Sequence, residues 1–360
     1  MSVTRSGAQA PSPDSTVDPS GPAPIVDARD VSVVFRKKRT LAAARHVRAV
    51  TDVTFQIAEG ETFGLVGESG SGKSTTGRAL LKLVPTASGS ITVAGHDVTA
   101  LRGAALRGAR RSMQMVFQDP YSSLDPSATV AASIAEPLIV HEKLSATAAR
   151  SRVNELIEMV GLRASYADRY PYEFSGGQRQ RLAIARAIAL NPRFIVCDEA
   201  VSALDVSTQN QVINLLERLR TEFGLTYLFI AHDLAIVRHI SHRVGVMYLG
   251  RIVESGPAER IYTAPAHPYT QALLSAIPDP RRVRGAADRL VLEGDVPDPA
   301  RPPVGCPFQT RCRFAMDICT HEMPEHTPVA GGGEVACHLQ TSGPTLAGSP
   351  LNDLDPASVR

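Results

Sequence analysis

Short apolar runs alternate along the chain with longer segments whose apolar residues recur at helical spacing. The runs Thr62–Val66, Arg193–Cys197 and Leu225–Ala231 predict buried strands. The segments Thr75–Val84 and Ser207–Phe223 predict helices that follow two of these strands. Strands that alternate with helices in this way favour an α/β fold built on a mostly parallel sheet.

Near the N-terminus the pattern is different. Strict alternation of apolar and polar residues predicts strands at Ile25–Phe35 and Val53–Ile57. The stretch between them, residues 36–48, is basic and is expected to form a solvated loop. Further along, Val244–Tyr248 and Arg251–Glu254 predict a hairpin.

Composition divides the chain into four parts. Residues 1–24 are rich in Ser, Pro, Gly and Ala, so we expect a disordered tail there and a second one at residues 341–360. Residues 25–256 form the predicted main domain, with a helical subdomain at about residues 119–180. Residues 257–340, where proline is frequent and four cysteines occur, are expected to form a small accessory region.

The overall composition limits the class of protein. Hydrophobic content of 43% and charged content of 21% are typical of a soluble globular protein. A net charge of +2 gives no general argument for nucleic-acid binding. We find no apolar run of about 20 residues, the length that spans a bilayer, and no secretion signal. We therefore expect the chain to stay in the cytosol, with its five cysteines reduced or metal-bound.

A glycine-rich segment between the first predicted strand–helix pair matches the pattern G-x-x-x-x-G-K-[ST]. Glycines let backbone N–H groups turn toward an anion, and the N-terminus of the next helix adds its positive dipole end. We expect Lys73 to contact the β- and γ-phosphates of ATP, and the Ser74 hydroxyl to bind Mg²⁺. The predicted nucleotide-binding residues are Gly67, Glu68, Ser69, Gly70, Ser71, Gly72, Lys73, Ser74 and Thr75.

Two carboxylates follow the predicted strand at Arg193–Cys197. A carboxylate at the end of a strand beside a phosphate loop can hold Mg²⁺ through water, which suits Asp198. The next residue, Glu199, is placed to orient or deprotonate the water that attacks the γ-phosphate. These residues predict hydrolysis of the bound nucleotide.

Further motifs resemble those of ABC-type ATPases and occur in that family's order. Phe174–Gln178 resembles the signature motif, with Phe in place of the commoner Leu, and Ser202–Asp205 resembles the D-loop. The single-residue matches are Gln118 (the Q-loop glutamine), His232 (the switch histidine) and Phe35 (the aromatic residue that stacks on adenine). The resemblance implies an α/β ABC-type P-loop ATPase with a mostly parallel core sheet, an antiparallel β subdomain and a helical subdomain.

The resemblance also implies how these residues act. In this family two cassettes pair head to tail with two ATP molecules between them. Ser175 and Gly177, with Gly176 and Gln178 in the same motif, would contact the partner's nucleotide, and Asp205 would couple the two sites. Gln118, Glu199 and His232 would be the catalytic residues of this chain's own site. Gln118 would also join Ser74 and Asp198 at Mg²⁺.

The segment that begins at Gln118 and parts of the C-terminal region resemble those of oligopeptide and dipeptide importers. The matching segments are Gln118–Pro126, His267–Leu274, Leu292–Pro297, Gly305–Phe308 and Arg311–Cys312. The resemblance implies a peripheral subunit at the cytoplasmic face of the cell membrane that energises peptide import. Its partners would be a sister ABC ATPase in a heterodimer, two transmembrane permease subunits and an extracytoplasmic peptide-binding protein, with no nucleic acid. The form of the motifs is closer to the second of the two ATPase subunits.

Cys306, Cys312, Cys319 and Cys337 have five, six and seventeen residues between them, without the C-x-x-C pair of an ordinary zinc ribbon. Four irregularly spaced thiolates can hold an iron–sulfur cluster. The importer subunits that the chain resembles carry a [4Fe–4S] cluster here. Zinc and unliganded thiols stay open, because spacing alone does not choose the metal. Cys197 lies in a predicted buried strand and is expected to be a core residue.

Two other functions fit the sequence less well. A soluble ABC-type ATPase that acts on nucleic acid or ribosomes typically carries two cassettes or a long coiled-coil insertion, and this sequence predicts neither. An exporter half would need a fused membrane domain. The solute itself stays open, because selectivity in such importers lies mainly in the binding protein and permeases. A non-peptide solute such as a nickel chelate, or glutathione, is therefore an alternative to di- and oligopeptides.

Overall fold

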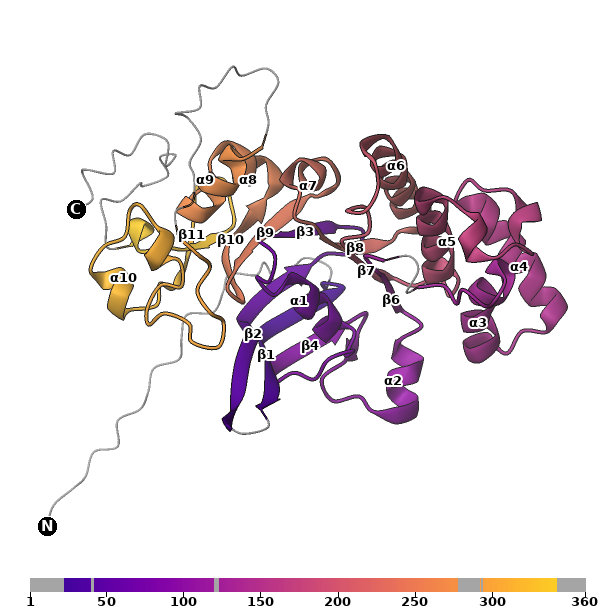
Figure 1. Ribbon diagram of the computed structural model, residues 1–360, viewed down its shortest axis with the longest axis horizontal. Helices are drawn as coiled ribbons and strands as arrows, with labels where there is room; N and C mark the ends of the chain where they lie inside the picture. Colours follow the sequence, from indigo (N-terminus) through magenta and orange to yellow (C-terminus); the bar gives the residue numbers. More distant parts are fainter. Residues whose placement is uncertain (1–22, 40–41, 120–122, 278–291, 293, 342–360) are drawn as a thin grey trace, which may run out of the picture.

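The computed structural model describes residues 23–39, 42–119, 123–277, 292 and 294–341. The tails predicted at residues 1–24 and 341–360 fall almost entirely outside the described residues. Two sheets form the centre of the molecule, and the helices pack around them (Figure 1). This arrangement confirms the predicted α/β fold.

The larger sheet has eight strands in the order β11-β12-β10-β9-β3-β8-β7-β6. Its parallel strands are β3 (Thr62–Val66), β6 (Met113–Val116), β7 (Phe194–Asp198), β8 (Thr226–Ile230) and β9 (Arg243–Tyr248). Its antiparallel strands are β10 (Arg251–Pro257), β11 (His326–Pro328) and β12 (Glu334–Ala336). All five parallel strands therefore present their carboxyl ends at one edge.

The parallel strands are buried on both faces, which explains their continuous apolar runs. In β7, Ile195 and Cys197 pack into one hydrophobic core, whereas Phe194 and Val196 pack into the other. This division follows from the alternation of side chains along a strand. Cys197 is fully buried, which confirms its predicted place in the core.

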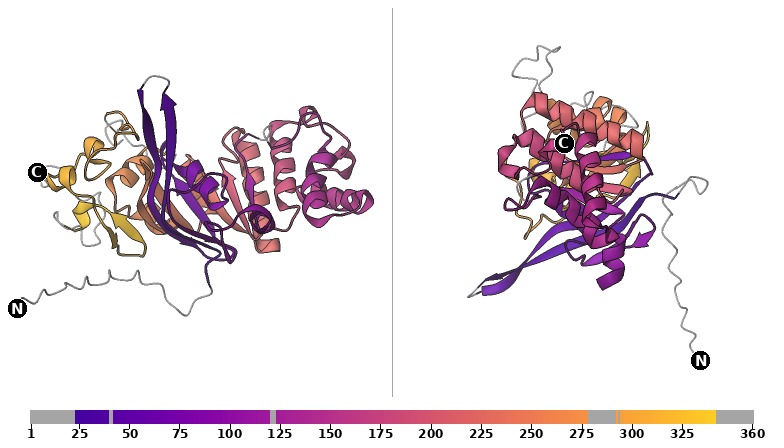
Figure 2. Two further views of the ribbon diagram at one scale, coloured as in Figure 1. Left: turned by 90° about the horizontal axis from the view of Figure 1, so that it is seen from below. Right: turned by 90° about the vertical axis from the view of Figure 1, so that its right-hand side faces the viewer.

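The smaller sheet is antiparallel, in the order β2-β1-β4-β5. Its strands are β1 (Val26–Arg39), β2 (Ala42–Ile57), β4 (Ser88–Val93) and β5 (His96–Asp97). The prediction of a loop at residues 36–48 was wrong, because β1 and β2 continue through residues 36–39 and 42–48 as paired strands, with Arg36 opposite His46. The hairpin projects from the body of the molecule (Figure 2). Arg36, His46 and Arg48 lie at exposed positions of these strands, and basic residues of this kind made the stretch resemble a loop in the sequence.

The helices divide into groups by position. Helix α1 (Lys73–Leu80) packs against both sheets. The helical subdomain lies at one end of the molecule and contains α3 (Val130–Glu142), α4 (Ala146–Met159) and α5 (Gly176–Ile188). The remaining helices are α2 (Gly103–Ala109), α6 (Val206–Phe223), α7 (Leu234–Ile240), α8 (Ala258–Thr263), α9 (Pro268–Ser275) and α10 (Ile318–His321). Short 3₁₀ turns lie at Ala164–Tyr166, Pro171–Glu173, Gln309–Arg311 and His338–Gln340.

The C-terminal region lies at the opposite end from the helical subdomain (Figure 1), but the larger sheet continues across the boundary predicted at residue 257. Strand β12 pairs with β10, with Val335 opposite Glu254. The buried Glu254 carboxylate pairs with Arg260 and accepts the backbone N–H groups of Ala266 and His267 at 2.8 and 3.0 Å. A buried charge held by several donors fixes the start of α9 to the sheet.

His267 caps α9 from a fully buried position. Its Nδ1 accepts a hydrogen bond from the Tyr269 N–H at 3.0 Å, so this nitrogen carries no proton. Burial, together with the nearby His326, lowers the pKa of His267 to about 3.

This histidine should make the protein less stable in mild acid. Between pH 6.5 and 3 the unfolded chain binds a proton at His267 that the folded chain does not, so stability falls as the pH falls. The free energy of unfolding should be about 2 kcal/mol lower at pH 5 than at pH 7 from this group alone. In His267→Asn, whose side-chain oxygen can also cap a helix, this part of the loss should vanish. Urea unfolding at both pH values measures it, and an equal loss in both proteins would refute the assignment.

Candidate nucleotide site

The glycine-rich loop lies between the carboxyl end of β3 and the first residue of α1. Gly67 has φ +150°, and a Cβ there would lie 2.1 Å from the Met247 carbonyl oxygen. Gly72 has φ +107°, and a Cβ there would lie 2.3 Å from the Ala49 carbonyl oxygen. The loop therefore needs glycine at both ends, because neighbouring backbone leaves no room for a side chain.

Lys73 points back into this loop. Its Nζ donates to the carbonyl oxygens of Gly67 at 2.8 Å and Glu68 at 2.9 Å. Burial lowers the pKa of Lys73, and the charges of Glu199, Asp198 and Glu68 oppose that shift. A buried ammonium without a charge partner is unfavourable, and the negative charge of a bound triphosphate would supply that partner.

The other loop residues line the same turn. Ser69 and Gly70 are exposed at its tip, whereas Ser71 is buried. The Ser71 N–H donates to the Glu68 carbonyl at 3.2 Å, and its own carbonyl accepts from the Gly250 N–H at 2.8 Å. Contacts with the β9–β10 turn thus hold the loop from outside.

Ser74 and Asp198 meet beside the loop. The Ser74 hydroxyl donates to Asp198 Oδ1 at 2.6 Å, and Asp198 is 2% exposed at the carboxyl end of β7. Arg78 lies 3.5 Å from the other carboxylate oxygen. In the described part of the chain, no three His, Cys, Asp or Glu side chains form a group that could hold a metal ion. An Mg²⁺ between Ser74 and Asp198 would therefore take its remaining ligands from nucleotide and water, as this ion commonly does.

The three predicted catalytic residues converge from neighbouring strand ends. Gln118 follows β6, Glu199 follows β7 and His232 follows β8. Gln118 Nε2 donates to Glu199 Oε2 at 2.8 Å, and His232 Nδ1 lies 3.9 Å from the same oxygen. Glu199 has φ +49°, an uncommon conformation outside glycine, and its N–H donates to the Ile230 carbonyl at 3.0 Å. This strained residue projects its carboxylate between the other two side chains.

The signature motif begins α5 in the helical subdomain. Ser175 is the N-cap: its hydroxyl accepts from the Gln178 N–H at 3.3 Å, and the Gln178 side chain accepts from the Ser175 N–H at 3.0 Å. Gly176 is half-buried and Gly177 is buried. A Cβ on Gly177 would lie 2.2 Å from Thr208 Cγ2, so α5 packs closely on the start of α6. The exposed Ser175 thus stands at a helix N-terminus, a favourable place for phosphate.

Asp205 caps α6 next to this motif. Its carboxylate accepts from the Thr208 N–H at 3.0 Å, the Thr208 hydroxyl at 2.7 Å and the Ser207 hydroxyl at 2.9 Å. These hydrogen bonds lower the pKa of Asp205 to about 2. Phe35, on β1 of the antiparallel sheet, is 41% exposed and opposite Val47, so its ring is accessible to a base.

The four C-terminal cysteines form no disulfide with one another, and three of them are buried. The Cys306 N–H donates to the Cys319 carbonyl at 2.9 Å. Burial raises the pKa of the Cys306 thiol to about 11 and that of the Cys312 thiol to about 12, and charge on neighbouring cysteines adds to both shifts. Burial and these other thiols also raise the pKa of Cys337. Within the described residues, however, no three of these side chains form a group that could hold a metal ion.

Comparison with known proteins decides the family. A family model described as "ABC transporter" matches residues 50–202, and one described as "Oligopeptide/dipeptide transporter, C-terminal region" matches residues 253–319. The oligopeptide transport ATP-binding protein AppF of Bacillus subtilis (strain 168) is 50% identical over 320 residues, 88% of this chain and 97% of the relative. The chain belongs to the oligopeptide/dipeptide family of ABC transporter ATP-binding proteins.

Other relatives and a solved ABC cassette are also similar to this chain. A putative peptide import ATP-binding protein of Brucella abortus (strain 2308) is 53% identical over 81% of this chain and 87% of its own length. The glutathione import protein GsiA of Pectobacterium atrosepticum is 47% identical over 89% of this chain, which spans 51% of that relative. The cassette MJ0796, solved as a dimer bound to ADP and Pi, superposes with a TM-score of 0.58 at 30% identity over 65% of this chain and 98% of its own.

The structure also adds residues to the ABC ATPase site that the sequence patterns did not assign to it. Tyr269 and Arg311 both contact Glu68 of the phosphate loop. The sequence contains their segments only as family hallmarks of the C-terminal region. In the sequence Tyr269 lies 201 positions from Glu68, and Arg311 lies 243 positions from it. No local pattern links residues so far apart, and only the fold brings them together.

Proposed function

We propose that this ABC ATPase binds ATP and Mg²⁺ at the loop of residues 67–74 and hydrolyses ATP to drive import of di- or oligopeptides. The observation that carries this proposal is the convergence of Gln118, Glu199 and His232 beside Lys73, Ser74 and Asp198. A carboxylate held by an amide donor is suited to orient and deprotonate an attacking water. The peptide solute is inferred from the names of the relatives, which are peptide transport or import proteins, and from the oligopeptide/dipeptide family model of the C-terminal region.

The proposed partners are a sister ABC ATPase, two transmembrane permeases and an extracytoplasmic peptide-binding protein. Pairing is supported by Ser175, which is exposed at the N-terminus of α5, where it could reach the nucleotide of a second cassette. Asp205 would lie in the same interface, next to Thr208 and Gly177. Among the described helices, none has the length and apolar character that crossing a membrane requires. We place the subunit at the cytoplasmic face, held there by the permeases.

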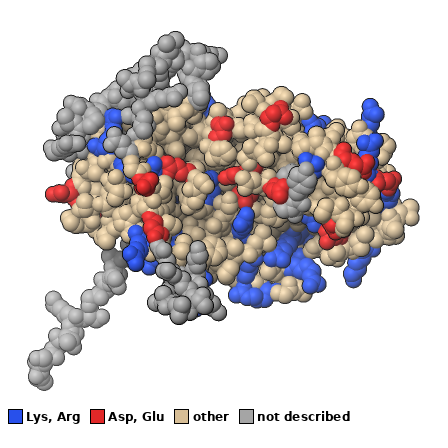
Figure 3. Space-filling view, in the orientation of Figure 1, with Lys and Arg blue, Asp and Glu red and all other residues tan. Residues whose placement is uncertain are grey.

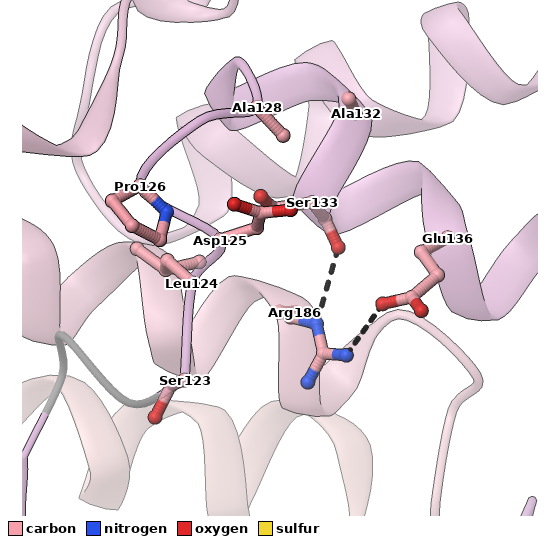
Figure 4. A pocket seen from close by; sticks show the side chains of 9 residues that line it. All are labelled: Ser123, Leu124, Asp125, Pro126, Ala128, Ala132, Ser133, Glu136 and Arg186. Carbon is pink, nitrogen blue, oxygen red and sulfur yellow. Dashed lines mark hydrogen bonds and ion pairs between the residues drawn. The ribbon is translucent and has the colours of Figure 1, made fainter.

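A groove of about 490 Å³ supports a docking place for the permeases (Figure 4). It lies between the segment that follows the Gln118 loop and helices α3 and α5. At its wall, Arg186 donates to the Ser133 carbonyl at 3.1 Å and to the Glu136 carboxylate at 2.7 Å. A permease segment seated here would contact the part of the chain that follows Gln118, the residue that hydrogen-bonds Glu199.

Surface charge supports a protein partner over nucleic acid. On the face in Figure 3, acidic and basic side chains are interspersed, and basic side chains gather near α2. Two of the arginines in this region are already engaged. Arg111 lies 3.3 Å from the Glu142 carboxylate, and Arg102 donates to the Thr99 and Leu101 carbonyls. A nucleic-acid surface would need a continuous basic stripe with free donors.

Transport itself tests the proposal. The subunit should co-purify with two permeases and a second ATPase, and vesicles containing this complex should accumulate labelled peptide only with ATP. A solute panel of dipeptide, longer peptide, glutathione and nickel chelate identifies the cargo class. Accumulation of none of them, or ATP turnover stimulated by RNA or ribosomes instead, would contradict the proposal.

We also propose that the four C-terminal cysteines hold an iron–sulfur cluster. The support is that all four cysteines lie within residues 306–337 and that three of them are buried in this small region, where a bound cluster would stabilise a limited core. Cys306, Cys312, Cys319 and Cys337 would be the ligands.

Metal analysis of anaerobically purified protein checks this prediction. Iron and sulfide should be present in about a four-to-four ratio with broad absorption near ~400 nm. Cys312→Ser should lose them, whereas Cys197→Ser, which changes a core residue in β7, should keep them. Stoichiometric zinc, or a metal-free protein with the same thermal stability, would refute the cluster.

A further inference from the structure

One residue of the phosphate loop is held by the C-terminal region. The Glu68 N–H donates to the Tyr269 hydroxyl at 2.8 Å. The Glu68 carboxylate accepts two hydrogen bonds from the Arg311 guanidinium, at 2.7 and 3.1 Å. Its carbonyl accepts from Lys73 Nζ at 2.9 Å. The backbone and the side chain of Glu68 are thus both held, by Lys73 within the loop and by Tyr269 and Arg311 of the C-terminal region.

The peptide unit between Gly67 and Glu68 connects these contacts. In a trans peptide the C=O and N–H point in opposite directions. The Gly67 carbonyl of this unit accepts from Lys73 Nζ at 2.8 Å, and the Glu68 N–H of the same unit donates to Tyr269. A rotation of this unit would break both hydrogen bonds at once. Tyr269 therefore sets the direction of the carbonyl that Lys73 contacts.

The Arg311–Glu68 pair is suited to hold the loop. The Arg311 side chain is 6% exposed, and that of Glu68 is 27% exposed, so water screens the pair little. Two parallel hydrogen bonds fix orientation as well as distance. The guanidinium also lies 5.9 Å from the centre of the Tyr248 ring. Removing either partner would leave a charge in a mostly buried place.

Tyr269 is also held in place by its neighbours. Its ring packs 4.8 Å from Tyr248 and 5.4 Å from Phe308, centroid to centroid. The start of α9, where it lies, is fixed by the His267 cap and by the Glu254 carboxylate in the larger sheet. Groups locked by packing and hydrogen bonds can in turn fix the geometry of a binding site.

We propose that the C-terminal region positions the phosphate loop for ATP, with Arg311 and Tyr269 as positioning residues that act through Glu68 on Lys73. The proposal rests on the proposed use of this loop as the ATP site. It does not depend on which solute is transported.

Equilibrium binding of MgATP to the full-length protein tests the proposal. Arg311→Met, which keeps the stem of the side chain, and Tyr269→Phe should each weaken ATP affinity by about ten-fold, the effect of one lost charge-assisted or well-placed hydrogen bond. Arg311→Lys should recover part of the loss, because it restores the charge without the bidentate geometry. The matched control is Arg313→Met. Arg313 lies 4.7 Å over the Phe314 ring, and its loss should leave ATP affinity unchanged.

A double variant separates positioning from general stability. In Glu68→Gln, the substitution Arg311→Met should cause little further loss of affinity, because its partner is already altered. An unchanged affinity in folded Arg311→Met and Tyr269→Phe would overturn the proposal, as would the same loss in Arg313→Met or a full additional loss in the Glu68→Gln background. If Arg311→Met does not fold, Tyr269→Phe and Glu68→Gln decide the outcome. If the wild-type protein itself binds no ATP and so behaves as Lys73→Met is expected to, the result contradicts the proposed function instead.

Discussion

Glu199→Gln should lower the rate of ATP hydrolysis by about 10²–10⁴-fold, the usual contribution of a general base. The amide keeps the size of the carboxylate but cannot accept the proton of the attacking water. ATP affinity should stay close to that of the wild type, because the Glu199 carboxylate is hydrogen-bonded to Gln118 and lies beside His232, and among the described residues it makes no hydrogen bond to the phosphate loop. Phosphate release and equilibrium ATP binding measure the two effects separately.

A surface glutamate gives the control for this substitution. Glu59 pairs with Arg193 at 2.8 Å, and its side chain is 54% exposed. Glu59→Gln should leave both turnover and affinity unchanged, because exposed pairs contribute little. Undiminished turnover in Glu199→Gln would remove this residue from the mechanism, and Gln118 and His232 would then need another role.

Lys73→Met should weaken ATP binding by more than about 100-fold, since a charged donor is worth roughly 1.5–3 kcal/mol for each hydrogen bond it makes to phosphate. The ammonium is buried within the loop, where its Nζ donates to the carbonyl oxygens of Gly67 and Glu68. Methionine keeps the apolar stem and removes the charge. Isothermal titration with MgATP gives the affinity, and thermal unfolding verifies that the variant folds.

Lys82, just beyond α1, is the matched control for Lys73. Its Nζ donates to the carbonyls of Val98, Thr99 and Leu101 at 2.9, 2.6 and 2.7 Å. Lys82→Met should lower thermal stability while ATP affinity stays the same. Equal affinities for Lys73→Met and wild type would show that the triphosphate binds elsewhere.

The parts of the site that lie close in sequence were predictable. The loop of residues 67–74 has its own pattern, and Asp198 and Glu199 follow a strand that apolar residues mark clearly. Their proximity followed from the rule that parallel strands present their carboxyl ends at one edge. The hydrogen bond from Gln118 to Glu199 and the position of His232 agree with that rule.

Other features depended on contacts that no local pattern encodes. Strands β1 and β2 continue through residues 36–39 and 42–48, where basic side chains favoured a loop, because the two strands pair with each other there. Strand β12 has only the short run Glu334–Ala336, yet it extends the main sheet beside β10. The contact of Arg311 with Glu68 needs the whole fold. The positive φ of Glu199 is set by its tertiary surroundings.

The most direct test of the central claim measures ATP turnover by the complete transporter in lipid vesicles, with and without peptide cargo and its binding protein. We expect cargo to raise the rate of ATP hydrolysis in the wild type and to leave it near zero in Glu199→Gln, while both proteins bind ATP. A turnover rate that is indifferent to cargo, or that survives in Glu199→Gln, would contradict the conclusion that hydrolysis at this loop drives peptide import.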